Sequence, residues 1–162
     1  MTKNFKILVV IFALMLFTGI RNHVCYAEGL TGLFNDFPGD TATLKLSPTV
    51  VRSRLVTVNF DLIQRKDVSA DTIKVAQSLN LNLFPDIVFV AILGRLENNP
   101  SGSYSWIGHL EGNPFSTVTL VVNDNIIMGN ITLGDKLYAV RFSGEFKTHV
   151  IQEIDSTRFP RD

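Results

Sequence analysis

Cysteine is almost absent from this sequence of 162 residues, which contains a single one, Cys25. Cys25 falls in the export signal that the N-terminus predicts, so the mature chain is expected to have no thiol and no disulfide. This absence excludes cysteine nucleophiles, zinc sites built from thiolates, and inhibition by a thiolate that caps a catalytic zinc. A chain of about 135 mature residues buries roughly two-thirds of its surface, so a hydrophobic core alone can stabilise it.

Histidine is also scarce, because only His109 and His149 follow the predicted signal. A zinc protease needs two histidines one helical turn apart with a glutamate between them, and this spacing does not occur. No serine stands in a Gly-x-Ser-x-Gly elbow. We therefore expect no catalytic, cofactor-binding or metal-binding residue, and a protein that is not an enzyme. Both histidines are interpreted as surface or rim residues of the sheet, with a metal-binding or inhibitory role as the alternative.

Clustered positive charge is missing as well. The predicted mature chain has 12 Lys and Arg residues against 15 Asp and Glu residues, a net charge of about −3. Nucleic-acid binding depends on clustered Lys and Arg that neutralise phosphates, and binding to anionic membranes needs a polybasic patch. We therefore expect no nucleic-acid partner and no membrane association after signal cleavage.

The N-terminus has the pattern of a secretory signal. Lys3 and Lys6 precede an apolar run of 14 residues, 7–20, which is short for a helix that must span with roughly 20 residues. A basic start, a short apolar run and small residues before a break are typical of a signal peptide, here with cleavage after Ala27. Arg21 leaves an uncleaved anchor as the alternative. The predicted location is secreted or periplasmic, reached by a Sec-type signal.

The first half of the mature chain shows both clear and ambiguous patterns. Apolar residues alternate with polar ones over 56–62, which predicts a half-buried strand. Residues 64–70 are polar and predict a loop. Residues 72–84 fit either a short helix capped by Ser69 or, in their second part, a strand. Residues 87–93 are apolar at successive positions and predict a central strand covered on both faces.

The second half is more regular. Gly- and Asn-rich turns separate short apolar-alternating runs, and such spacing is typical of antiparallel hairpins. The predicted strands are 104–110, 117–122, 126–133, 137–142 and 146–154. We therefore expect an all-β, mostly antiparallel fold, a β-sandwich or open barrel of about eight to nine strands with at most one short helix.

One family resemblance is carried by this region. Trp106, Gly108 and Gly112 form a Trp-x-Gly-x-x-x-Gly core, followed by the strand STVTLVV (116–122), the turn GNIT (129–132) and the closing EID (153–155). These features resemble the N-terminal pro-domain of bacterial secreted reprolysin-like zinc metalloproteases. In that family the pro-domain leads into a zinc-binding catalytic domain, whereas this sequence ends at Asp162. The expected organisation is a signal peptide, 1–27, and a single β-rich pro-domain-like domain, 28–162.

The resemblance implies a partner and a site. The expected function is that of a secreted non-catalytic module that binds a zinc metalloprotease in trans, as folding chaperone or inhibitor. Its expected partner-binding tail comprises Glu153, Ile154, Asp155, Arg158 and Phe159, and a frayed terminus is the alternative. Two other functions stay open: a free-standing extracellular sandwich that binds a glycan or envelope partner after losing its protease, or a truncated gene product.

Trp106 has two interpretations of its own. Its period-two neighbours Tyr104 and Leu110 favour a buried core tryptophan, and an exposed sugar-stacking platform is the alternative. The same reasoning predicts a core built on Trp106, Leu120, Ile131, Val140 and the apolar face of 56–62.

The signal pattern leads to a first testable prediction. Because Cys25 and Ala27 are small residues at the −3 and −1 positions, we expect cleavage after Ala27, so that N-terminal sequencing of the exported protein starts at Glu28. Recovery of residues 1–27 with the protein in a membrane fraction would contradict this expectation and favour the uncleaved anchor.

Overall fold

The structure is a computed structural model that describes residues 31–64, 66–69 and 72–159. The predicted signal peptide lies outside these residues. Nine strands form one antiparallel sheet in the order β1-β2-β11-β10-β9-β8-β7-β6-β5. Their bounds are β1 (Phe34–Asp36), β2 (Val50–Val58), β5 (Ser78–Phe84), β6 (Ile87–Asn98), β7 (Tyr104–Leu110), β8 (Asn113–Asn123), β9 (Ile126–Leu133), β10 (Lys136–Ser143) and β11 (Thr148–Asp155).

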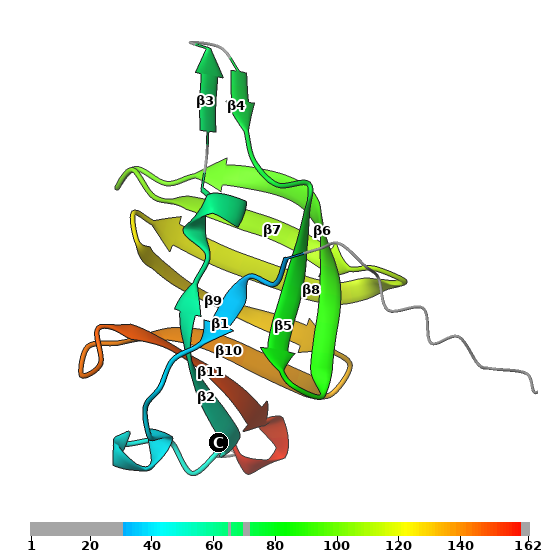
Figure 1. The fold of residues 1–162 in the computed structure, drawn as a ribbon. Helices are drawn as coiled ribbons and strands as arrows, with labels where there is room; N and C mark the ends of the chain where they lie inside the picture. The colour runs from blue at the N-terminus through cyan, green and yellow to red at the C-terminus, as the bar shows by residue number, and fades with distance from the viewer. Residues whose placement is uncertain (1–30, 65, 70–71, 160–162) are drawn as a thin grey trace, which may run out of the picture.

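The sheet curls into a nearly closed barrel (Figure 1). The predicted all-β class is confirmed, and of the two predicted architectures the open barrel is the one that the structure adopts. A separate hairpin, β3 (Lys66–Ser69) with β4 (Thr72–Lys74), forms its own two-stranded sheet and projects away from the barrel. The described helices are three short 3-10 turns, η1 (Thr41–Thr43), η2 (Phe60–Leu62) and η3 (Ser156–Arg158).

The turns of the second half explain why its strands were predictable. Asp124 adopts a φ of 49° between β8 and β9, and Gly134 a φ of 59° between β9 and β10. Asp and Gly are among the residues that tolerate the left-handed region required by tight hairpins. The predicted strands 104–110 and 126–133 coincide with β7 and β9.

The first half differs from its predictions in three places. Strand β2 ends at Val58, and Phe60 and Leu62 belong to η2, where Leu62 N–H donates to Asn59 O at 3.2 Å. The predicted loop 64–70 contains β3, and residues 72–84 contain β4 and β5 but no helix. Period-two alternation continues across the bend after Val58, and alternation alone does not reveal where a backbone turns.

Strand β6 is not the central strand that its composition suggested. It lies next to β5, the last strand in the sheet order. In the part of the chain that the structure describes, its outer face is not covered by a second layer, and Val88 on that face is 56% exposed. A continuous apolar run predicts cover on both faces only when a second layer is present. Here a single curled layer leaves the outer apolar residues at the surface.

The barrel interior is one contiguous apolar cluster. Trp106 is completely buried, so the predicted core position is confirmed and the sugar-stacking alternative is wrong. Gly108 makes room for it, because a Cβ there would lie 2.9 Å from the Trp106 ring and 2.0 Å from Ile92 O. Other fully buried members of the cluster include Leu33, Val56, Leu81, Val118, Leu120, Ile127, Ile131, Val140 and Ile151.

The two ends of the sheet meet at a seam that lacks a regular ladder. Leu33 N–H donates to Asn80 O at 2.9 Å, and Gly32 forms an isolated parallel bridge with Asn80. The Asn82 side chain then takes the place of a strand: its Oδ1 accepts from Phe34 N–H at 3.0 Å and its Nδ2 donates to Phe34 O at 2.6 Å. A side-chain amide thus satisfies both backbone groups of Phe34 across the seam.

An arginine continues the closure beyond β1. Arg54 on β2 donates from Nη1 to Asn82 O at 2.7 Å and to Leu83 O at 3.1 Å, both on β5. Its Nε donates to Asp36 at 2.8 Å. Because these carbonyls lie on the edge of the sheet, the guanidinium satisfies groups that would otherwise need another strand.

The seam yields a second prediction. Replacing Asn82 with alanine removes a donor and an acceptor from Phe34, so we expect the free energy of unfolding to fall by about 1–3 kcal/mol. Urea unfolding measures the loss, and hydrogen exchange at the Phe34 amide locates it. Asn82→Asp is the matched comparison: it keeps the acceptor for Phe34 N–H but sets a carboxylate oxygen against Phe34 O, so it should lose at least as much stability as Asn82→Ala. An unchanged midpoint with Phe34 still protected in Asn82→Ala would contradict the closure described here.

Candidate functional site

The barrel interior is the first place to look for a site, because barrels of this size either fill with side chains or hold one small ligand. One end is covered by the segment that follows β2. Tyr104 OH donates to Ile63 O, and Trp106 Nε1 donates to Ala76 O at 3.0 Å. Ile63 is itself fully buried in the core cluster. The interior at this end is therefore packed and tied down.

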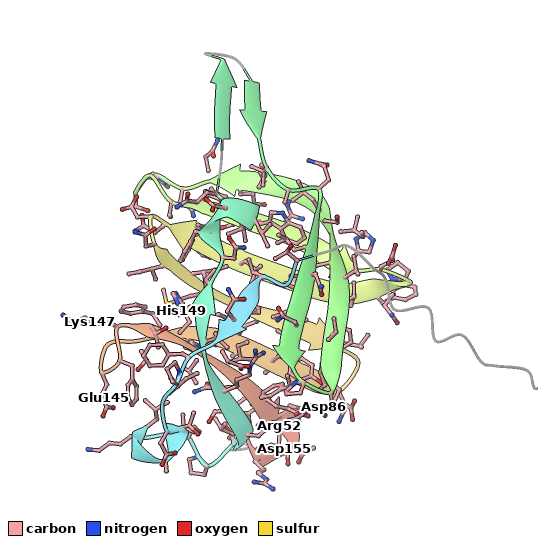
Figure 2. The ribbon with its side chains drawn as sticks, viewed as in Figure 1. Arg52, Asp86, Glu145, Lys147, His149 and Asp155 are labelled. Carbon is pink, nitrogen blue, oxygen red and sulfur yellow. The ribbon has the colours of Figure 1, made fainter. Side chains whose placement is uncertain are left out.

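The opposite end is crossed by Arg52 (Figure 2). Its Nε donates to Glu153 Oε2 at 2.6 Å and its Nη1 to Asp86 Oδ1 at 2.8 Å, while the guanidinium lies 4.1 Å from the centre of the Phe84 ring. The hydrogen bond from Arg52 lowers the pKa of Asp86, and both carboxylates raise the pKa of Arg52. This ion-pair network links β2, β11 and the β5–β6 turn across the barrel mouth.

The residues predicted as a partner-binding tail lie beside this mouth. Glu153 is engaged with Arg52, and Ile154 ends the ladder of β11 with β2. The Asp155 side chain caps η3, accepting from Thr157 N–H at 3.0 Å, and it pairs with Arg158 at 2.9 Å. The hydrogen bonds from Thr157 lower the pKa of Asp155. The first part of the tail is thus structural, and a partner-binding role for it stays a prediction.

Phe159, the last of the predicted tail residues, follows η3 and is 47% exposed. A shallow hollow of about 230 Å³ lies next to the tail, lined by Val51, residues 135–136 and residues 153–157. The structure brings Glu153, Ile154 and Asp155 together around this hollow and leaves Arg158 and Phe159 outside its lining.

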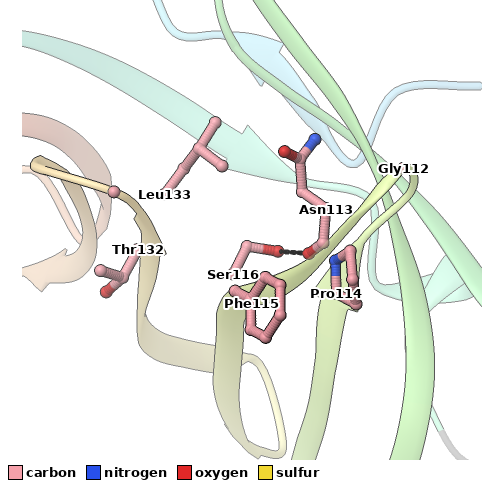
Figure 3. Close-up of a pocket in the computed structure, with 8 residues that line it drawn as sticks. Gly112, Asn113, Pro114, Phe115, Ser116, Thr132 and Leu133 are labelled. Atoms are coloured by element: carbon pink, nitrogen blue, oxygen red, sulfur yellow. Dashed lines mark hydrogen bonds between the residues drawn. The ribbon is translucent and has the colours of Figure 1, made fainter.

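A second, larger hollow lies at the same end of the barrel, between the β7–β8 and β9–β10 turns. Its volume is about 560 Å³, and its walls are residues 112–116 and 132–134 (Figure 3). Phe115 stands on its wall with its side chain 100% exposed. Large apolar residues are seldom left fully in water, and aromatic residues are enriched at protein interfaces.

A bulge in β8 produces this exposure. Leu110 pairs with Asn113 and Gly108 with Val118, so the residues between Asn113 and Val118 face only one residue of β7. The Ser116 hydroxyl stabilises the bulge: Oγ accepts from Leu110 N–H at 2.7 Å and donates to Asn113 O at 2.6 Å. Bulges commonly redirect a side chain next to a functional site. Here the bulge holds Phe115 outward in a fixed place.

Sequence reasoning missed Phe115. The predicted strands end at Leu110 and begin again at Thr117, so Phe115 belongs to neither. The available signal was the Asn-Pro-Phe step itself, because proline within a strand segment indicates an edge or a bulge.

His149 is a buried titratable residue whose ring packs beside Phe142 and Phe60, so its predicted place at the surface or rim of the sheet is wrong. It is 4% exposed, and its Nε2 accepts from Ile127 N–H at 3.1 Å, so the neutral ring carries its proton on Nδ1. The Phe142 and Phe60 rings lie 5.4 and 6.0 Å away, and burial lowers the pKa of His149 to about 4. Among the described residues no group of three His, Cys, Asp or Glu side chains could hold a metal ion.

A family model described as the BamI lipocalin-like domain matches residues 56–157, more than half of the chain. The chain belongs to this family. No curated protein and no solved structure matches the chain. Among the described residues there is no helix with the length and apolar character needed to cross a bilayer.

The family match corrects four sequence-based predictions. The resemblance to a reprolysin-like pro-domain is wrong, and with it the predicted metalloprotease partner, the chaperone or inhibitor function and the propeptide-like character. The physical reason lies in the motif: Trp106 and Gly108 pack the core of a barrel, and Gly112, with a φ of 74°, makes a turn. Such residues mark a β-fold and no particular function.

The lipocalin-like family agrees with part of the predicted location. The match supports a location in the cell envelope. The type of signal that exports the chain stays a prediction. The alternative of a free-standing binding module, predicted as a sandwich, comes closer to the lipocalin-like family than the pro-domain does.

His149 provides a third prediction. In the unfolded chain histidine titrates near pH 6.5, and in the fold its pKa is about 4. Between these values the unfolded state binds a proton that the folded state does not. Stability is therefore complete above about pH 6.5 and falls on acidification towards pH 4, by on the order of 3 kcal/mol.

Denaturant unfolding across that pH window measures the dependence. His149→Gln should flatten it, because glutamine can accept from Ile127 N–H without titrating. His109→Gln, a change of the other mature histidine, should leave the slope intact. Equal slopes in the His149→Gln and parent proteins would show that His149 does not cause it.

Proposed function

We propose that this chain is a non-catalytic protein-binding barrel of the bacterial envelope that takes part in the assembly of outer-membrane proteins. The family description supports the role in assembly, since a BamI lipocalin-like domain suggests that its members take part in outer-membrane protein assembly. The exposed aromatic residue Phe115, held at a bulge beside an uncharged hollow, is the observation that carries the binding function.

The arrangement of the barrel supports binding at its surface. Large side chains occupy the interior, with Trp106 and Leu120 completely buried. Hydrogen bonds tie the covering segment to one end, and Arg52 links three elements across the other. A partner protein therefore meets the outer face and the hairpin tips, and Phe115 is the most exposed apolar side chain there.

We also propose that the chain has no catalytic activity. His149 Nε2 accepts from Ile127 N–H within the core, and its ring is shielded by Phe142 and Phe60. The carboxylates with lowered pKa values, Asp86 and Asp155, are engaged in an ion pair and in the cap of η3. Groups used in this way stabilise the fold and leave no acid and base poised over a cleft.

We also propose that a Sec-type signal peptide, residues 1–27, delivers the chain to the periplasm. The basic start and short apolar run support this route. A mature single domain from residue 28 onwards would then carry the barrel.

A fourth prediction tests the proposed function in cells. A photo-crosslinking amino acid placed at Phe115 should form adducts with components of the outer-membrane assembly machinery, because the side chain projects from the barrel. In the Phe115→Ser variant the crosslinking amino acid is placed at a neighbouring position such as Thr132. This variant should form fewer adducts than a Thr132 crosslinker in the parent protein, and it should reduce the amount of folded outer-membrane proteins. An aromatic residue that acts as a hot spot contributes about 2 kcal/mol or more to an interface.

Phe159→Ser is the matched control, since Phe159 is also exposed but belongs to the predicted tail. Its adducts and its outer-membrane proteins should equal those of the parent. If Phe159→Ser lowered the adducts and the folded outer-membrane proteins and Phe115→Ser did not, the binding site would lie in the tail. No adduct with any assembly component from Phe115 would contradict the proposed function.

A further inference from the structure

Two carboxylates flank the hollow beside Phe115. Glu111 precedes Gly112 in the β7–β8 turn, and Asp135 follows Gly134 in the β9–β10 turn, so one acid adjoins each wall along the chain, and Asp135 also lines the smaller hollow beside it. Both residues are exposed. Neither side chain has an ion-pair partner among the residues that the structure describes.

The hollow itself carries no charge. Its walls are made of Gly, Asn, Pro, Phe, Ser, Thr and Leu. Phe115 and Pro114 offer apolar surface on one wall and Leu133 on the other (Figure 3). Such a centre is suited to an apolar side chain, since desolvating it leaves no charge unpaired.

The base that follows Asp135 in sequence is paired with another acid. Lys136 adjoins Asp135 in sequence, but its Nζ lies 3.9 Å from Glu153 Oε1, at the barrel mouth crossed by Arg52. Lys136 is thus directed to the ion-pair network, and the acidic rim keeps its charge. An apolar centre with an acidic rim is complementary to an apolar group with a basic rim.

We infer that the hollow beside Phe115 binds a partner polypeptide through an apolar side chain that is flanked by lysine or arginine. This inference names the partner chemistry of the proposed function and rests on it for the site. The bulge held by Ser116 presents Phe115 in a fixed position, so little ordering is needed on binding. Glu111 and Asp135 select the basic flanks and exclude acidic ones.

A second copy of this chain fits the site less well. A two-fold contact brings the same surface of both copies together, so the rim acids would face each other. Like charges across an interface disfavour association. The occupant is therefore a different polypeptide with basic residues around its anchor.

The experiment uses the complete mature protein and short synthetic peptides as probes. The peptides carry a central Phe with Lys on both sides, the same Phe with Glu on both sides, or a central Ser with the Lys flanks. Fluorescence polarisation of labelled peptides gives the dissociation constants at low and high salt. We expect the Lys-flanked Phe peptide to bind most tightly, and its affinity to fall with salt because exposed charges are screened.

Substitutions in the barrel complete the test. Reversing both rim charges, Glu111→Lys with Asp135→Lys, should weaken the Lys-flanked peptide about tenfold and favour the Glu-flanked one. Phe115→Ser should weaken both Phe peptides. The control is Glu145→Lys. Glu145 is also exposed, in the turn between β10 and β11 at the other end of the barrel (Figure 2), so its reversal should leave the dissociation constants of the peptides unchanged. Thermal unfolding verifies that each variant keeps the fold.

Equal affinity for Lys-flanked and Glu-flanked peptides would overturn the inference, as would an absence of binding by all peptides. Self-association of the parent protein that Phe115→Ser abolishes, seen by sedimentation, would also overturn it in favour of a second copy. The proposed function fails separately, when crosslinking from Phe115 in cells finds no assembly component.

Discussion

The barrel depends on the closure of its seam. A single sheet that curls on itself must satisfy the backbone groups of its first and last strands, and here β1 is only three residues long. Asn82 therefore binds both backbone groups of Phe34, and Arg54 binds the carbonyls of Asn82 and Leu83 beyond it. Side chains complete what a longer strand would otherwise supply.

Closure determines which side chains stay at the surface. Once the sheet is closed, the inward residues pack around Trp106 and the outward residues of a single layer remain at the surface, as Val88 does. The hairpin tips are then the places where the chain can depart from the regular ladder. The bulge at Ser116 and the hollow beside Phe115 occur at such a tip, and there the described surface combines an exposed aromatic side chain with a concave wall.

Four acidic residues show that the same side-chain chemistry can have different roles in the fold. Glu153 and Asp155 have the same side-chain chemistry as Glu111 and Asp135. The first pair is engaged by Arg52, Thr157 and Arg158, whereas the second pair has no ion-pair partner among the residues that the structure describes. Neighbours brought from distant parts of the chain make this difference, because Arg52 and Glu153 are 101 residues apart.

The amino-acid sequence by itself determined the all-β class, the hairpins of the second half and the buried position of Trp106. These features are local: alternation sets the two faces of a strand, and Asp124 and Gly134 permit the turns between strands. Tertiary structure decided the rest. Whether β6 was covered on both faces, whether Glu153 was free, and whether Phe115 was buried depended on how the sheet curled. Curling brings together residues far apart in sequence, so no short pattern contains this information.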